Sequence, residues 1–151
     1  MAVLEIHKAG DPVLKKVCEP VKRIDKKVKR ILKDMAETLY KTKNGIGLAA
    51  PQVGILQRIV VIDLQDGNGL LELINPVITK KEGSQVVGEG CLSVPNFEGE
   101  VGGPYMWNAS IRMLPGKSSS LPRKDCLPSV CSMKRIIWTG SCLRTRRLRS
   151  R

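Results

Sequence analysis

The stretch GIGLAAPQVG, residues Gly45 to Gly54, is the segment from which the fold of this chain can be argued. Two closely spaced glycines precede small apolar residues and then Gln52. Glycine lets a backbone approach a ligand closely, and a glutamine amide can donate a hydrogen bond to an oxyanion. The same letters also suit a tight turn at a helix end with Gln52 exposed, so the stretch alone leaves both interpretations open.

A second stretch, EGCLSVP, covers Glu89 to Pro95 and places Cys91 directly after a glycine. A cysteine thiolate is a good ligand for iron or zinc. A lone cysteine is also often just a small buried side chain. The second stretch therefore adds a candidate metal ligand without deciding its role.

The residues around these stretches predict one long helix and several strands. Asp25 can cap a helix that runs to about Thr42, in which apolar residues recur at helical spacing. Residues 58–64 and 70–74 are apolar and predict two strands, joined by a turn of the hairpin type. We therefore expect an α+β fold in which the helix packs on a mostly antiparallel sheet. The expected buried stripe of the helix is Val28, Ile31, Leu32, Met35 and Leu39.

Charge divides the chain near Val101. Residues 1–100 hold 15 Lys and Arg against 13 acids, a net of +2, whereas residues 101–151 hold 11 against one acid, a net of +10. The last part also lacks any apolar period, which indicates a disordered basic tail. We predict a domain at 1–101 and a tail at 102–151, with the C-terminal third non-native or disordered.

Other composition features exclude several classes of protein. No apolar run is long enough to span a membrane, and the N-terminus lacks the features of a signal peptide. Five irregularly spaced cysteines do not form a disulfide framework, so we expect a cytoplasmic, reducing setting. The aromatic content of 3% weakens any stacking argument for nucleic-acid binding.

Together, GIGLAAPQVG and EGCLSVP closely resemble the first two signature motifs of the peptide deformylase family, in that family's order. GDPVL, at Gly10 to Leu14, resembles its N-terminal segment. The resemblance covers about residues 1–101. It implies an α+β metallohydrolase that removes the formyl group from the N-terminal formylmethionine of new bacterial proteins. It also implies a bacterial cytoplasmic enzyme that works on N-formylmethionyl peptides at the ribosome and uses Fe²⁺, with Zn²⁺, Ni²⁺ or Co²⁺ as substitutes.

The resemblance assigns roles to individual positions. Cys91 would be a metal ligand, and Gln52 with the backbone NH of Leu92 would stabilise the oxyanion. The remaining positions, all implied to shape or support the substrate site, are Ile46, Gly47, Glu89 and Gly90.

The third motif of the family, a helical HExDH, is absent from this sequence. It supplies two histidine ligands and the glutamate that acts as general acid–base. Reading residues 131–140 (CSMKRIIWTG) one base out of frame permits QHExDHLDG. In that reading Met133 followed by Lys134 must give glutamate, and Trp138 followed by Thr139 must give aspartate. The sequence thus indicates a frameshift after about residue 101, in the gene or in the sequencing.

Several expectations follow for the chain as written. It should be inactive or nearly so, and its metal should not be held. His7 could replace a ligand only if the fold brought it near Cys91. An accidental zinc site from Cys126, Cys131 and Cys142 has no zinc-finger spacing. Without the missing helix, the buried stripe should be partly exposed. The alternative interpretation is a deformylase-like remnant whose basic tail binds RNA or the ribosome.

Overall fold

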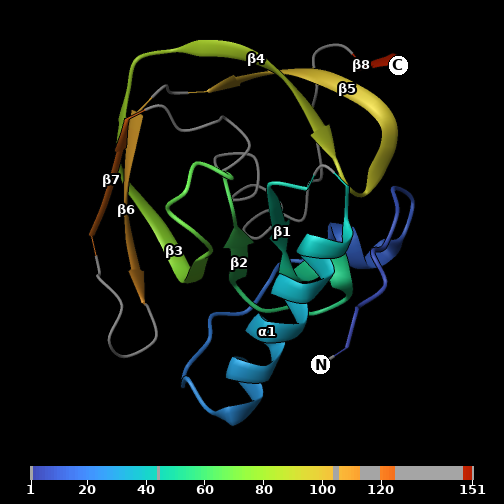
Figure 1. The fold of residues 1–151 in the computed structure, drawn as a ribbon, viewed down its shortest axis with the longest axis vertical. Helices are drawn as coiled ribbons and strands as arrows, with labels where there is room; N and C mark the ends of the chain where they lie inside the picture. The colour runs from blue at the N-terminus through green and yellow to red at the C-terminus, as the bar shows by residue number, and fades with distance from the viewer. Residues whose placement is uncertain (1, 44, 104–105, 113–119, 125–147, 151) are drawn as a thin grey trace.

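The computed structural model of this chain describes residues 2–43, 45–103, 106–112, 120–124 and 148–150. Its main helix, α1, covers Lys26–Lys41 (Figure 1). The Asp25 side chain accepts a hydrogen bond from the Val28 backbone NH at 2.9 Å, which satisfies one free donor at the helix start. The predicted cap and helix are therefore confirmed.

Before α1, the N-terminal arm runs along the outside of the fold. It contains one short 3-10 helix, η1 (Pro12–Lys15), capped by the Asp11 side chain. Further on, Glu19 is tied to the segment before the second strand, because its NH binds the Leu56 carbonyl and its own carbonyl binds the Arg58 NH. The arm is thus fixed by backbone hydrogen bonds.

Two antiparallel sheets make up most of the rest of the described chain. Five strands pair in the order β1-β2-β3-β6-β7, and three pair in the order β4-β5-β8. The short 3-10 helix η2 (Ala50–Val53) follows β1 directly. The strands are β1 (Gly47–Ala49), β2 (Ile59–Ile62), β3 (Leu71–Glu82), β4 (Gln85–Cys91), β5 (Val94–Gly103), β6 (Met106–Arg112), β7 (Ser120–Lys124) and β8 (Leu148–Ser150).

The predicted hairpin joins β2 and β3. Gly67 and Gly69 both have positive φ, and the Asp66 side chain accepts from the Asn68 NH at 3.0 Å. Strand β3 is longer than predicted, because it continues through Asn75 and Pro76 with a register shift against β6. Asn75 absorbs that irregularity at φ 51°, a conformation that asparagine tolerates.

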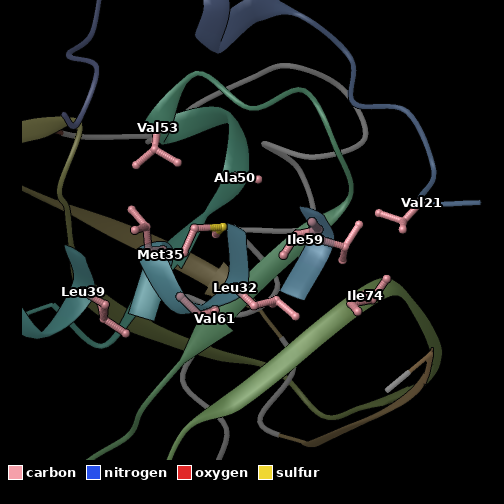
Figure 2. Packing of buried hydrophobic residues seen from close by; sticks show 11 residues of the cluster. Val21, Leu32, Met35, Leu39, Ala50, Val53, Ile59, Val61 and Ile74 are labelled. Atoms are coloured by element: carbon pink, nitrogen blue, oxygen red, sulfur yellow. The ribbon is translucent and has the colours of Figure 1, made fainter. Parts of the chain in front are cut away.

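The core lies between α1 and the sheet that begins with β1. Figure 2 shows side chains from α1, η2, β2 and β3 converging on one cluster. We expected the stripe on α1 to be partly exposed, and this expectation is wrong. Val28, Leu32, Met35 and Leu39 are at most 4% exposed, and Ile31 is partly buried against the same cluster. Residues of β2, η2 and β3 pack in the same cluster as this stripe.

The predicted division into a domain at 1–101 and a disordered tail at 102–151 stays a prediction, and the structure describes three further strands in the second part. β6 extends the larger sheet beside β3, β7 pairs with β6, and β8 pairs with β5. Strand pairing uses backbone groups, so it does not require the apolar periodicity that this part of the sequence lacks. Among the described residues, no helix is long and apolar enough to cross a membrane.

Candidate active site

Gln52 joins the two sequence stretches that carry the resemblance. It lies in η2 and is only 3% exposed. Its Oε1 accepts a hydrogen bond from the Ala49 NH at 2.9 Å, which orients the amide group. Its Nε2 then donates to Ser93 Oγ at 3.2 Å and lies 3.7 Å from Cys91 Sγ. The interpretation of Gln52 as an exposed turn residue is therefore excluded.

Cys91 ends β4, and the chain turns at once into β5. Cys91 pairs with Val94, so Leu92 and Ser93 form the turn between the two strands. The Cys91 side chain is partly buried, whereas Ser93 is fully buried against Gln52. The turn thus holds a thiol and a hydroxyl beside the same amide group.

Ser93 is a site residue that the sequence analysis missed. It stands inside EGCLSVP, but a serine in a tight turn is usually a surface residue. Only the burial of Ser93 beside an amide from a segment about forty positions earlier shows its role. Its hydroxyl fixes the direction in which the Gln52 amide points.

The N-terminal arm links both stretches, which the sequence analysis also missed. The His7 NH donates to the Gln52 carbonyl at 2.8 Å, and the Ala9 NH donates to the Ser93 carbonyl at 2.7 Å. Between them, Lys8 Nζ donates to the Leu92 carbonyl at 2.9 Å. Three consecutive residues of the arm therefore hold the glutamine and the cysteine turn at a fixed separation.

The two ring nitrogens of His7 lie beside Asp11 and Gly54, so the ring is not placed to act as a metal ligand beside Cys91. Its Nδ1 lies 2.6 Å from Asp11 Oδ2, and a Cβ on Gly54 would come within 2.9 Å of its Nε2. Gly54 also has φ 76°, so this position requires glycine twice over. The Val13 NH and the His7 ring both hold the pKa of Asp11 below its ordinary value.

The predicted substrate-site residues fall on two strands. Ile46 and Gly47 lie at the start of β1, the edge strand of its sheet among the described residues, and the Ile46 carbonyl accepts from the Asp63 NH. Glu89 and Gly90 lie in β4, paired with Gly99 and Glu98 of β5. The space beside Gly90 is open, so a side chain there would meet no neighbouring atom.

The residues at this site do not fit a catalytic metal ion. A catalytic iron or zinc site needs about three protein ligands and an open position. In the described part of the chain, no three His, Cys, Asp or Glu side chains come together to hold a metal. His7 is the single histidine of the whole sequence, and its ring nitrogens face Asp11 and Gly54. Cys126, Cys131 and Cys142 lie outside the described residues.

Comparison with solved structures defines the class of fold. A peptide deformylase from Thermotoga maritima superimposes with a TM-score of 0.82 and 33% identity, over 93% of this chain and 94% of that chain. The fold is therefore that of an α+β hydrolase of the deformylase type, as the sequence predicted.

Comparison with sequences shows the family. The family model of polypeptide deformylase matches residues 3–127, which passes the predicted boundary at Val101. A peptide deformylase from Acetivibrio thermocellus is 56% identical over 104 residues, 69% of this chain and 59% of that protein. One from Thermoanaerobacter pseudethanolicus is 46% identical over 127 residues, 84% of this chain and 78% of that protein. The chain belongs to the peptide deformylase family.

The match is incomplete in length. Over three curated relatives, the aligned part covers 59%, 65% and 64% of their own chains. The chain thus spans about three fifths of the length of these curated relatives.

Proposed function

We propose that this chain is a peptide deformylase that keeps the residues for substrate binding and oxyanion stabilisation. The two histidine ligands and the glutamate of the HExDH motif are missing from the sequence as written. The observation that carries the proposal is the Gln52 amide, held 3.7 Å from Cys91 Sγ by Ala49 and Ser93. Two segments 39 positions apart meet there through side chains that suit oxyanion stabilisation and thiolate ligation.

In the proposed reaction, the formyl amide of an N-formylmethionyl peptide is hydrolysed to formate and a free amino terminus. Gln52 Nε2 and the Leu92 NH donate hydrogen bonds to the oxygen that becomes negatively charged. The substrate backbone lies along the edge of β1 that has no partner strand among the described residues, beginning at Ile46 and Gly47, because an extended peptide can add to such a strand edge. Glu89 and Gly90 border the same site.

The chain as written lacks the groups that would complete this chemistry. Cys91 is the metal ligand in the proposal, but the sequence holds one histidine and no HExDH. Neither the two further ligands nor the general acid–base is present, so we propose that the chain is inactive or nearly so. Fe²⁺ would be the metal of the intact protein, which would work in the bacterial cytoplasm on peptides emerging from the ribosome.

A shifted reading frame would explain why the HExDH motif is absent. The permitted string QHExDHLDG at residues 131–140 supplies both histidines and the glutamate in one step. Re-reading the coding DNA from about codon 95 to beyond the stop tests this directly, since one gained or lost base should be found.

Formate release tests the proposed function. The chain as written, supplied with Fe²⁺ and an N-formylmethionyl peptide, should release no formate above the background without protein. A chain with the frame restored should release formate under the same conditions, and its Gln52→Ala form should be about 10²–10³ times slower. Formate release by the chain as written, with its DNA frame confirmed, would refute the proposal. A restored chain that stays inactive would refute the frameshift explanation.

A further inference from the structure

The N-terminal half of α1 carries a dense group of cations. Of residues 26–33, five are Lys or Arg and none is acidic, and all five are exposed. Four of them lie on the side of α1 opposite its buried stripe, because their spacings of three and four return to one side of a helix. They border a shallow hollow of about 280 Å³ together with Asp34. We call this group the α1 basic face: Lys26, Lys29, Arg30 and Lys33.

The placement of these charges opposes the stability of the helix itself. The N-terminal end of a helix is the positive end of its dipole, where acids are favourable and cations are not. Here the first turn contains no acid. The pairs Lys26 with Arg30 and Lys29 with Lys33 are also like charges one turn apart, which repel. Apart from the Asp25 cap and the Arg30–Asp34 pair, the charges in this part of α1 therefore oppose the helix dipole and repel one another.

Among the described residues, few carboxylates neutralise the positive charges of the α1 basic face. Arg30 Nε lies 3.8 Å from Asp34 Oδ2, and this is the one ion pair found in α1 among the residues described. In the same part of the chain, no carboxylate forms a salt bridge with Lys26, Lys29 or Lys33. These three ammonium groups therefore keep their charge available to an external anion.

Positive charge is dense in the N-terminal part of the chain. Residues 1–33 hold ten Lys and Arg against four acids, a net of +6. The 118 later residues also sum to +6, because residues 34–100 have a net of −4 and residues 101–151 a net of +10. Figure 1 places the N-terminal half of α1 at the lower end of the molecule, far from β4 and β5. A local density of positive charge attracts a polyanion toward the surface that carries it.

We propose that the α1 basic face binds the phosphate backbone of a nucleic-acid duplex. Residues 26–33 span about 10 Å along the helix axis, so the face can meet more than one phosphate. Residues 1–39 contain no Phe, Tyr or Trp, and the Tyr40 hydroxyl is bonded to Asp63, which disfavours a single strand held by base stacking. An anionic membrane is also disfavoured, since the apolar side of α1 is buried in the core and cannot insert into lipid.

The first experiment measures binding of the full chain to a fluorescein-labelled duplex by fluorescence anisotropy, over a series of salt concentrations. RNA and DNA duplexes of the same mixed sequence are used, so that the two sources of phosphate can be distinguished. The variant Lys29→Gln/Lys33→Gln is compared with Lys41→Gln/Lys43→Gln, which removes the same charge from exposed positions outside the face. Residues 102–151 are identical in both, so their +10 cannot produce a difference.

We expect the Lys29/Lys33 pair to weaken duplex binding about tenfold and to reduce the slope of log Kd against log salt by about 1–2. The Lys41/Lys43 pair should change binding by about twofold or less. Equal losses in both pairs would assign binding to overall charge or to the basic tail, and would overturn the proposal. Binding to vesicles of phosphatidylcholine and phosphatidylserine, with none to either duplex, would overturn it as well.

A second variant separates binding from folding. Lys26→Glu/Lys29→Glu places two acids in the first turn of α1, where they complement the helix dipole. We expect a higher Tm together with weaker duplex binding, and a misfolded chain cannot give that combination. A higher Tm with unchanged binding would show that the face is only a solvated surface. The outcome does not depend on whether the chain releases formate.

Discussion

At the scale of single residues, Gln52 is held by more side-chain hydrogen bonds than a residue of a short 3-10 helix usually is. Its oxygen is fixed by the Ala49 NH and its nitrogen by Ser93 Oγ, in a setting that excludes water. A group fixed in this way keeps its direction without a ligand, which is the property that oxyanion stabilisation requires.

Replacing Gln52 with alanine should lower the free energy of unfolding of the chain as written by about 1–3 kcal/mol, because the buried Ser93 hydroxyl loses its donor. Urea unfolding followed by circular dichroism measures this change. The exposed Gln65, changed to asparagine, is the control and should alter stability by less than about 0.5 kcal/mol. Equal effects of the two changes would mean that the Gln52 contacts contribute nothing.

Cys18 differs from Cys91 in its surroundings. It is 1% exposed, and burial raises the pKa of its thiol to about 11, with the Arg58 charge opposing that rise. Arg58 Nε also donates to the Cys18 carbonyl at 3.1 Å. Cys18 is therefore a packed core residue with little thiolate character at neutral pH.

The raised pKa of Cys18 predicts how stability depends on pH. Between about pH 9 and 11 the folded chain keeps the thiol proton while the unfolded chain has lost it, so the free energy of unfolding falls as pH rises. Below pH 9 this contribution is fully present. Urea unfolding at several pH values should show a steeper fall in this window for the native chain than for Cys18→Ala. Parallel curves would contradict the assignment.

At the scale of elements, α1 is the part of the fold that the rest is built around. Asp25 caps its start, and Thr42 Oγ1 binds the Leu39 carbonyl at its end. Gly45 follows because a Cβ there would lie 2.1 Å from Thr42 Oγ1. The first sequence stretch can therefore enter β1 only by passing close to the end of the helix.

Leu32, at the middle of the α1 stripe, is fully buried, so Leu32→Ala should lower the free energy of unfolding by about 2–5 kcal/mol. Thermal and urea unfolding would measure the loss. Its neighbour Lys33 is exposed, and Lys33→Ala should stay within about 0.5 kcal/mol of the native chain. A small effect at Leu32 would mean that the stripe is not packed in solution.

At the scale of the whole molecule, the core and the candidate site depend on different residues. The described members of the core between α1 and the larger sheet all precede Val101. A metal site, in contrast, needs particular donors at particular places. We therefore predict that the proposed frameshift leaves the deformylase fold without deformylase chemistry.

By itself, the sequence determined the family, the capped helix with its buried stripe, the β2–β3 hairpin and the absence of a histidine pair. These are local patterns or counts, and each can be stated from neighbouring residues. Only the tertiary structure decided that Ser93 directs the Gln52 amide, that residues 7–9 join the two stretches, and that the stripe stays covered. The roles of Cys91, Leu92 and Glu89 remain predictions. Contacts between distant segments depend on how the chain closes in space, and no local pattern encodes that.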